Sequence, residues 1–551
     1  MASTAEKPTV LPAHFTFTSS DTKKTGLRLI ALHDARTGFT VRTALSQDGK
    51  QVPAIMAFAG ARFSRSALTA EGLFEEINVN AATAQKKLAN IFVNYGHASV
   101  GDMANLFAYI ENVPRYLMFQ FFYSSALGSG QERSSRYQDF SQAIPPQISL
   151  YMQGKKKASK QLQKQYESIF HSLIENYVEY LPQVTQAYTD FYQPDATNKG
   201  HASALQARCF DTVRYFLPTG TNTSGAYITS AREWTRLIVE FKSSPYKEAQ
   251  CLGEQLEMLF SPSPEIAREI NYLPEAPDLI RHTEADPRTQ TTLDGLTDLA
   301  KDLIKLAGKK PAQPSKHNLS VKAVKGLSSV QTYLFYSLLR LAPQLQVAQF
   351  KKWFSSLSSR KLAKISQLLL SEYDHHHHLP LYSHTGGYTF ELNLTVSEII
   401  DLNRHRAWGR FTPFLETQQT EKLLENGFQL PLYLEHKAFK DLRVAFTDKL
   451  SQHYETLQNF AAELPAEVSP RLLLSLIPNA HNARFFMSGG SKEIHYMTHL
   501  RARPGGHINY REAAWQIAEK ASHIEPLLES ITLGENKRPD PFDREEFFDR
   551  S

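Results

Sequence analysis

The sequence predicts an α+β protein made of two tandem domains, each a small mixed or antiparallel sheet with long helices. The chain has 551 residues, more than one hydrophobic core usually organises. Apolar residues make up 42% of it, which is enough to form two cores. Each half combines stretches with the alternation typical of strands and longer stretches with apolar residues three and four positions apart, as in helices.

The first half is expected to open with strands. From Leu27 to Phe63 apolar and polar residues alternate, and Thr37-Gly38 and Asp48-Gly49 are pairs typical of turns. Helical periodicity begins at Leu68. The helices predicted in this half span residues 71–95, 158–190, 199–216 and 228–260.

A connection separates the two domains. Between Asn271 and Lys325 the composition shifts to Pro, Asp, Thr and Lys, and residues 308–316, Gly-Lys-Lys-Pro-Ala-Gln-Pro-Ser-Lys, cannot hold a regular packed element. We therefore place the N-terminal domain at 1–275, the linker at 276–325 and the C-terminal domain at 326–551. The second half is predicted to contain a helical stretch at 327–373, a strand at 388–396 and helices at 397–410, 435–463, 490–503 and 510–530.

This order of elements roughly repeats that of the first half, so a duplication is predicted. A weak local similarity agrees with it: Lys87–Ile91 precedes a turn that contains histidine, as Lys361–Ile365 precedes His375–His378. The four histidines follow Asp374 and invite a metal interpretation, but consecutive residues point in different directions, so a polar turn is favoured and no metal site is expected.

Composition excludes several classes of function. The net charge of +5 is small for this length and no long Lys/Arg block occurs, so no nucleic-acid surface is indicated. Two cysteines, Cys209 and Cys251, exclude a disulfide framework and suit a reducing compartment, the cytoplasm. Neither cysteine has a base in a motif, and no Rossmann or P-loop motif occurs. No signal peptide or apolar run of eighteen residues is found, so neither secretion nor membrane contact is expected.

Residues Gln131–Tyr137, here called the signature loop, carry the first candidate site. They read Gln-Glu-Arg-Ser-Ser-Arg-Tyr and follow Gly128-Ser129-Gly130, whose glycines allow a backbone to approach a ligand closely. Arginine offers a planar fork of donors to phosphate, hydroxyl groups add more donors, and a carboxylate can orient a base or ribose. On these residues alone, a solvated polar turn is an equal alternative.

The signature loop resembles a motif of the flavin-dependent thymidylate synthases, Asn-Glu-x-Ser-x-Arg-Tyr, and matches it at every specified position but the first. Other segments resemble the family in order and approximate spacing, so the resemblance extends from about Ala61 to Glu254 and implies the family fold. These segments are Ala61–Ser64, Gly96–Ser99 with Asp102, Arg214–Pro218, Ala231-Arg232, and Ala249-Gln250 with Glu254.

One departure divides the motifs between the halves. The family's Arg-His-Arg, expected just before the signature loop, falls here at Tyr123-Ser124-Ser125. It reappears as Arg404-His405-Arg406, here called the basic triplet, after a segment that resembles the family's strand and helix. If the triplet is helical, its two arginines do not share a face and reach different anions; the alternative is a basic surface helix.

The end of the chain continues this resemblance, in a degenerate form. Leu476-Ile477-Pro478 resembles the Leu-Pro turn, and His499-Leu500-Arg501 followed by His507 resembles a segment that binds the nucleotide phosphate before a flavin-contacting histidine. No second signature loop follows the basic triplet, Leu474 stands where the first half has Arg214, and Lys492 stands where it has Arg232. Each half thus keeps what the other lacks.

The resemblance implies reductive methylation of dUMP to dTMP with FAD as cofactor and NAD(P)H and methylenetetrahydrofolate as co-substrates. It also implies a homodimer that acts as a pseudo-tetramer. Two alternatives stay open: a non-catalytic nucleotide-binding or assembly module, and a flavin enzyme acting on another nucleotide. The implied catalytic residues are Glu132, Ser134 and Arg136; the implied cofactor-binding residues are His97, Ser99, Asp102, Arg232, Arg404, His405, Arg406 and His507; the implied substrate-binding residues are Gln131, Glu132, Ser134, Arg136, Arg214 and Arg501.

Overall fold

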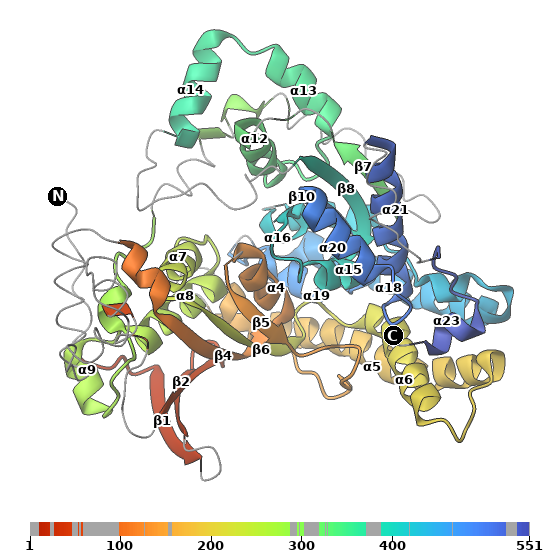
Figure 1. Ribbon diagram of the computed structural model, residues 1–551, viewed down its shortest axis with the longest axis horizontal. Coiled ribbons are helices and arrows are strands. Elements are labelled where there is room, and N and C mark those ends of the chain that lie inside the picture. The colour runs from red at the N-terminus through yellow and green to blue at the C-terminus, as the bar shows by residue number, and fades with distance from the viewer. Residues whose placement is uncertain are drawn as a thin grey trace, which may run out of the picture.

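The protein is α+β, with two antiparallel sheets and many helices, in a computed structural model (Figure 1). The predicted fold class is confirmed. None of the described helices has the length and hydropathy needed to cross a lipid bilayer. The structure describes residues 10–22, 27–46, 53, 57–58, 98–125, 127–152, 157–286, 295–296, 298–301, 303, 319–324, 327, 329–370, 387–417, 419–465, 467–524 and 537–549.

The first sheet has the strand order β1-β2-β3-β4-β6-β5. Alternate residues of β4, such as Leu106 and Ala108, are buried beneath helices α7 and α8 on one face of the sheet. The predicted turn between β2 and β3 contains Gly38 at a φ of +75°, a conformation that favours glycine. The strands are β1 (Phe15–Thr22), β2 (Leu27–Asp34), β3 (Thr40–Ser46), β4 (Asn105–Pro114), β5 (Ser129–Glu132) and β6 (Asn222–Ser230).

The helix predicted at 71–95 lies outside the described residues, and among the other helices predicted in this half one stretch differs from the structure. The stretch 228–260 is not one helix: β6 runs to Ser230, whose hydroxyl accepts from Glu233 N and starts α7, and the chain breaks again before α8. The helices are α4 (Arg115–Ser124), α5 (Lys160–Tyr192), α6 (Lys199–Val213), α7 (Ala231–Lys242), α8 (Lys247–Phe260) and α9 (Pro264–Glu269), with 3₁₀ helices η1 (Ala98–Met103), η2 (Ile148–Tyr151), η3 (Arg214–Phe216) and η4 (Pro277–Leu279).

The second sheet has the order β7-β8-β10-β9. Strand β7 lies in the interval assigned to the linker and pairs with β8 along its whole length. Residues 308–316, which are predicted to lack a regular packed element, lie outside the described residues. The stretch 327–373 contains three helices rather than one, with Pro343 in the first break. The strands are β7 (Ser320–Val324), β8 (Tyr388–Thr395), β9 (Gly409–Phe411) and β10 (Asn482–Gly489).

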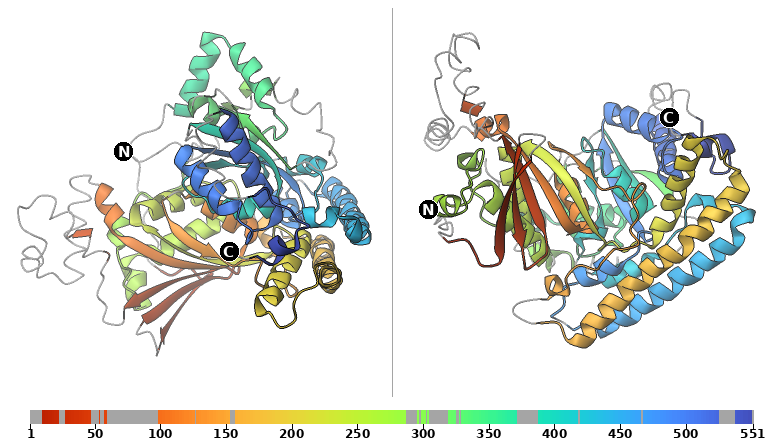
Figure 2. Two further views of the ribbon diagram at one scale, coloured as in Figure 1. Left: turned by 45° about the vertical axis from the view of Figure 1, so that its right-hand side comes forward. Right: turned by 90° about the horizontal axis from the view of Figure 1, so that it is seen from below.

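The remaining helices cover this sheet and join it to the first half. In Figure 2 the long helices α5 and α18 lie side by side. The helices are α12 (Ser329–Leu339), α13 (Val347–Ser355), α14 (Ser359–Leu370), α15 (Val396–Leu402), α16 (Pro413–Glu416), α17 (Thr420–Leu423), α18 (Lys440–Glu463), α19 (Arg471–Leu476), α20 (Ser491–Arg501), α21 (Ile508–Ile524) and α23 (Arg544–Phe548), with η6 (Leu424–Asn426), η7 (Leu432–Glu435) and η8 (Lys437–Phe439).

The predicted helix 397–410 is wrong beyond Leu402. Helix α15 ends there, and the chain turns at Asn403 and enters β9, which pairs with β10. Arg410 holds this turn, because its Nη1 donates to Asn403 Oδ1 at 2.9 Å. The basic triplet therefore lies in a turn, and the argument from helical spacing does not apply to it.

The two halves meet about a local pseudo-two-fold axis at their Leu-Pro and Ile-Pro turns. Pro218 and Pro478 form an antiparallel bridge. Thr219 N donates to Ile477 O at 2.9 Å, and Asn479 N donates to Leu217 O at 2.9 Å in return. Each turn leads into a central strand, β6 or β10, so the reciprocal bonds relate equivalent positions of two repeats.

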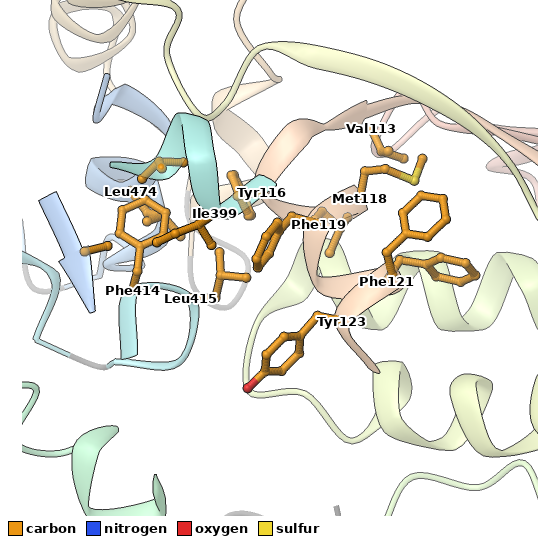
Figure 3. Close-up of a cluster of buried hydrophobic side chains, with 14 of the residues drawn as sticks. Val113, Tyr116, Met118, Phe119, Phe121, Tyr123, Ile399, Phe414, Leu415 and Leu474 are labelled. Atoms are coloured by element: carbon orange, nitrogen blue, oxygen red, sulfur yellow. The ribbon is translucent and has the colours of Figure 1, made fainter. Parts of the chain in front are cut away.

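A further pair of matching hydrogen bonds shows that α4 and α15 begin at equivalent positions of the two repeats. Arg115 N donates to Thr221 O and Val396 N donates to His481 O, each at 3.0 Å. Counting along the helices from this pair places Tyr123 at the position of Arg404, in agreement with the motif comparison. Figure 3 shows Phe119 of α4 beside Ile399 and Leu415, so the two helices pack where the halves meet.

Candidate functional site

The signature loop and the basic triplet lie together between the halves. Strand β5, which leads into the loop, and the turn after α15 face each other across this interface (Figure 1). Arg406 Nη2 donates to Gly130 O at 2.8 Å, and its guanidinium carbon is 5.3 Å from the Phe122 ring centroid. We call the polar residues around this junction the composite centre: Glu132, Arg136, Asp211, Arg214, Asp401, the basic triplet, Arg501 and His507.

The glycines before the signature loop serve packing. A Cβ on Gly128 would overlap the Tyr227 ring, and a Cβ on Gly130 would overlap Ala226 O. Gly130 lies in β5, paired with β6. The interpretation of these glycines as a ligand-approach loop is therefore wrong; they allow β5 to lie against Tyr227 and present the Gly130 carbonyl to Arg406.

Arg136 is held by a buried carboxylate that the sequence analysis missed. Its Nε and Nη2 donate to the two Asp211 oxygens at 2.7 and 2.8 Å, and Nη2 also lies 3.3 Å from Gly505 O. Burial alone would raise the pKa of Asp211, but the charge of Arg136 outweighs it and the pKa is lowered. Asp211 could have been suspected, because it lies three residues before Arg214 on one helical face.

Arg214 joins the halves through a second buried ion pair. Its Nη2 is 2.9 Å from Asp401 Oδ2, and its Nη1 is 3.5 Å from Ser135 Oγ. The positive charges of Arg214, Arg404 and Arg136 outweigh the effect of burial and hold the pKa of Asp401 well below its usual range. Asp401 was also missed, although it precedes Arg404 by one helical turn.

His405 and Arg501 form a pair within the second half. Arg501 Nε donates to His405 Nε2 at 2.7 Å, and Arg501 Nη2 donates to Asp401 O at 3.3 Å. Burial, together with the charges of Arg501 and Arg410, lowers the pKa of His405. His405 is therefore a neutral acceptor that orients Arg501, with its proton on Nδ1. Arg404 is exposed at the rim of the composite centre.

Glu132 is the carboxyl group of the signature loop. Its Oε1 is buried and has no hydrogen-bond partner among the described residues. Burial raises its pKa despite the nearby charges of Arg115 and Arg404. Ser134 Oγ accepts from Arg136 N at 3.3 Å and shapes the turn, while Gln131 is exposed. A buried carboxyl with a raised pKa can both donate to and accept from a ligand.

His507 lies at the inner wall of the composite centre. It is fully buried, and neither ring nitrogen has a hydrogen-bond partner in the part of the chain that is described. Burial lowers its pKa to about 3. Glu398 Oε1 is 3.8 Å from His507 Nδ1, and burial raises the pKa of Glu398 to about 7 while Tyr215 OH donates to it.

Three other predicted cofactor residues belong to a different place. Asp102 lies in η1 and Arg232 in α7, at the C-terminal end of β6, and their side chains form an ion pair of 3.0 Å, each 44% exposed. Ser99 also lies in η1, and His97 lies outside the described residues. Within the described ranges, no hydrogen bond or ion pair joins Asp102 or Arg232 to the composite centre.

The pseudo-two-fold counterpart of the composite centre is filled by side chains. It contains Tyr116, Gln120, Tyr246, Glu248 and Arg471, which we call the filled counterpart. Arg471 Nη2 donates to Gln120 Oε1 at 3.0 Å, its guanidinium carbon is 4.0 Å from the Tyr246 ring centroid, and its Nε is 3.8 Å from Glu248 Oε1. Tyr116 OH donates to Glu248 Oε1 at 3.2 Å.

In the first half, Tyr123-Ser124-Ser125 stand at the position of the basic triplet, and acidic side chains bond to the two serines. Ser125 Oγ donates to Glu233 Oε1 at 2.9 Å, Ser124 Oγ donates to Glu240, and Arg236 pairs with both glutamates. The position that is basic in the second half therefore carries a net negative charge in the first. This arrangement disfavours an anion.

The composite centre fits a phosphate-bearing ligand. Arg406 Nε and Arg214 Nε are buried donors without a partner among the described residues, and the oxygens of a bound phosphate would satisfy them. His507, which is neutral because burial lowers its pKa, offers one donor and one acceptor nitrogen. Within the same residues no group of His, Cys, Asp and Glu is arranged to hold a metal ion. Both cysteines are buried, and burial raises the pKa of Cys251 to about 11, which disfavours a thiolate.

Comparison with known proteins agrees with these observations. Residues 47–260 match the family model described as thymidylate synthase complementing protein. The match includes β4, the signature loop and β6, which carry the first half of the composite centre.

Two relatives extend beyond that domain. The chain is 22% identical over 449 residues to a UPF0159 protein of Chlamydia muridarum (strain MoPn / Nigg), covering 80% of this chain and 78% of the relative. It is 22% identical over 443 residues to a UPF0159 protein of Chlamydia pneumoniae, covering 79% and 78%. Among solved structures, a UMP/dUMP methylase PolB from Streptomyces cacaoi bound with 5-Br dUMP is similar at a TM-score of 0.26 and 15% identity, over 37% of this chain and 84% of that one.

Proposed function

We propose that the protein catalyses the reductive methylation of dUMP to dTMP with FAD, NAD(P)H and methylenetetrahydrofolate. The observation that carries this proposal is the junction of the signature loop with the basic triplet, where Arg406 donates a hydrogen bond to Gly130 O. Motifs that one family domain holds together are split over the chain and meet again in space. The family membership of residues 47–260 supports the reaction class.

The nucleotide would bind to the signature loop side of the composite centre. Arg136 and Arg214 offer guanidinium groups now paired with Asp211 and Asp401, so an entering phosphate exchanges one anionic partner for another without exposing the arginines to water. Glu132 and Ser134 lie on the same loop, where a carboxyl and a hydroxyl hold the base or sugar. Arg501 is the phosphate ligand from the second half, and Gln131 lies at the exposed edge.

The flavin would bind on the basic triplet side. FAD supplies the hydride that completes the methyl group. Arg404 and Arg406 bind phosphate oxygens, neutral His405 keeps Arg501 in place, and His507 offers two free ring nitrogens to a polar edge. In this proposal Asp102 and Arg232, which lie with Ser99 at the other end of β6, contact flavin brought by a second copy of the chain. The resemblance assigns the same role to Ser99 and to His97, which lies outside the described residues. The homodimer and the cytoplasmic location are part of the same proposal.

The first test is the visible absorbance of the full-length protein after incubation with FAD and desalting. We expect stoichiometric flavin in the unmodified protein and its loss in an R404A/R406A double variant. A matched control, R360A/R268A, changes two exposed arginines outside the composite centre and keeps the flavin. Release of the C5 hydrogen of dUMP, measured with all co-substrates, then tests catalysis. A flavin-free unmodified protein, or one without hydrogen release, would contradict the enzyme proposal.

A non-catalytic module is the second candidate, and a specific observation favours it: the first half has Tyr123-Ser124-Ser125 at the triplet position and the filled counterpart leaves no second centre. Binding of dUMP without hydrogen release would support this module. A third candidate is a flavin enzyme for another nucleotide. Comparing the affinities of the protein for dUMP, UMP and dCMP distinguishes this third candidate from the first.

A further inference from the structure

Arg115, the first residue of α4, is a buried cation outside every motif discussed above. The residue is 2% exposed and its backbone N–H is bonded to Thr221 O. One face of the guanidinium lies over the Phe140 ring, 4.8 Å from its centroid. Both terminal nitrogens, Nη1 and Nη2, are buried without a hydrogen-bond partner among the described residues. An unpaired buried guanidinium is costly, so its presence requires a reason.

The surroundings of Arg115 connect it with the composite centre. Besides burial, the charges of Glu132, Arg214 and Asp401 act on it, in that order. Two of these neighbours also have a buried atom without a partner in the described part of the chain, Glu132 Oε1 and Arg214 Nε. Unsatisfied donors of two arginines thus lie around the inner end of the proposed nucleotide site.

The fold itself does not require an arginine at this position. The pseudo-two-fold equivalent is Val396, which makes the matching backbone bond to His481 O and is 5% exposed. An apolar side chain therefore serves at the start of the equivalent helix. The charge on Arg115 is better explained by a ligand than by the architecture of the repeat.

We propose that Arg115 binds the phosphate group of the nucleotide together with Arg214. The pairing of the charges agrees: Arg136 and Arg214 are paired with the buried carboxylates of Asp211 and Asp401, whereas Arg115 has no ion pair among the described residues. A phosphomonoester, which carries about −1.5 to −2 at neutral pH, would supply the missing counter-charge. The two free terminal nitrogens give the fork geometry that arginine uses for phosphate.

This inference rests on the proposed nucleotide binding, and calorimetric titration of the full-length protein tests both. The ligands are dUMP, deoxyuridine and inorganic phosphate, and the variants are R115M, R115V, which copies Val396, and R115K, which keeps the charge without the fork. We expect R115M to bind dUMP about 30-fold more weakly or worse, R115K to lose less, and phosphate binding to fall in parallel. The affinity for deoxyuridine should not change.

Thermal unfolding without ligand provides the second readout. Since R115M and R115V remove an unpaired buried charge, we expect each to melt at the same or a higher temperature than the unmodified protein. The surface variant R268M should change neither binding nor melting. A large fall in melting temperature for both apolar variants would show that Arg115 is structural and overturn the assignment.

The outcomes separate the two proposals. Equal losses for dUMP and deoxyuridine, or unchanged dUMP binding in R115M, would overturn the role of Arg115 in phosphate binding and leave the nucleotide site standing. An unmodified protein that binds neither dUMP nor phosphate would overturn both. Weaker dUMP binding in a variant as stable as the unmodified protein supports the assignment.

Discussion

The composite centre and the filled counterpart occupy equivalent places about the same local axis, yet they have opposite chemistry. In the composite centre, arginines face buried carboxylates and several polar atoms are left without partners among the described residues. In the filled counterpart, the rings of Tyr116 and Tyr246 enclose the single guanidinium of Arg471, Gln120 accepts from its Nη2, and Glu248 lies 3.8 Å from its Nε. Arg471 Nε and Nη1 have no hydrogen-bond partner among the described residues, so packing against aromatic rings is what fills this place. The composite centre holds ion pairs that an anionic ligand can exchange, whereas the filled counterpart is packed as part of the protein core.

This difference shows how a duplicated fold can divide its duties. After duplication, two equivalent sites need only one intact set of motifs, and each half is free to lose the residues that serve the other site. The first half keeps the signature loop and the second keeps the basic triplet, so both losses fall on the filled counterpart. Aromatic side chains there replace ligand contacts with buried apolar area, which stabilises the interface between the halves.

The largest effect is expected for substitutions of Arg214, which allow folding stability and nucleotide binding in the composite centre to be measured separately. R214M leaves Asp401 buried without its closest cation, and we expect it to reduce the free energy of unfolding by about 3 to 5 kcal/mol. Removing both charges in R214M/D401L should restore most of that stability. Urea unfolding of the two variants measures this.

The double variant R214M/D401L should regain stability without regaining nucleotide binding. Both R214M and R214M/D401L are expected to lose dUMP binding, because the guanidinium is absent from each. Restored dUMP binding in the double variant would show that Arg214 is only a structural partner of Asp401 and would remove it from the site.

The next effect is on pH dependence. Burial raises the pKa of Glu398 to about 7, whereas the unfolded chain titrates near 4.5. The folded protein therefore holds this proton between pH 4.5 and about 7 while the unfolded chain releases it, so Glu398 makes the protein less stable as the pH rises through this window. Relative to the unmodified protein, E398Q should gain about 2 to 4 kcal/mol between pH 4.5 and 7.

The measurement is denaturant unfolding of both proteins at several pH values, and only their difference is interpreted, because buried histidines titrate in the opposite direction. His507, His453 and His481 have pKa values lowered by burial, and they cost stability as the pH falls. E455Q, at an exposed position of α18, is the control. A flat difference for E398Q would mean that the carboxyl group is ionised throughout.

Sequence reasoning reached the fold class, the family and the division of the motifs because these depend on local patterns. The signature loop matched at four of the five specified positions of the motif, and the Leu-Pro turns and the strand at 388–396 have local signals that the structure confirms. The helix predicted through the basic triplet failed because pairing of β9 with β10, a contact between distant residues, stops α15 at Leu402.

The partners inside the composite centre were beyond the reach of a sequence without a structure. Asp211 and Asp401 are ordinary acidic residues on amphipathic helices, and only tertiary contact turns them into buried counterions. Arg115 has no motif and looks like a charged residue at the start of a helix. Glycines were misread for the same reason, since the ring that requires Gly128, Tyr227, is almost one hundred residues away.

A smaller effect tests whether the filled counterpart still takes part in cofactor binding. S125A removes the hydrogen bond donated to Glu233 at 2.9 Å and the one accepted from the buried Tyr227 OH. Arg236 still satisfies Glu233 but the Tyr227 hydroxyl loses its acceptor, so we expect a loss of about 1 to 3 kcal/mol in the free energy of unfolding. Flavin stoichiometry, measured by absorbance, should stay that of the unmodified protein. Reduced flavin content in S125A would mean that the counterpart is a second site and that the comparison drawn above is wrong.

The smallest effect concerns the exposed pair of Asp102 and Arg232. Because both side chains are 44% exposed, R232A should change the free energy of unfolding by less than about 1 kcal/mol. If this pair contacts flavin brought by a second copy, R232A will lower flavin affinity at protein concentrations where the dimer forms, and light scattering will show the dimer intact. D102A is the matched variant, and it should strengthen binding of the flavin phosphates by freeing Arg232. Equal flavin affinity in the unmodified protein and both variants would confine cofactor binding to the composite centre, and each chain would then build its site alone.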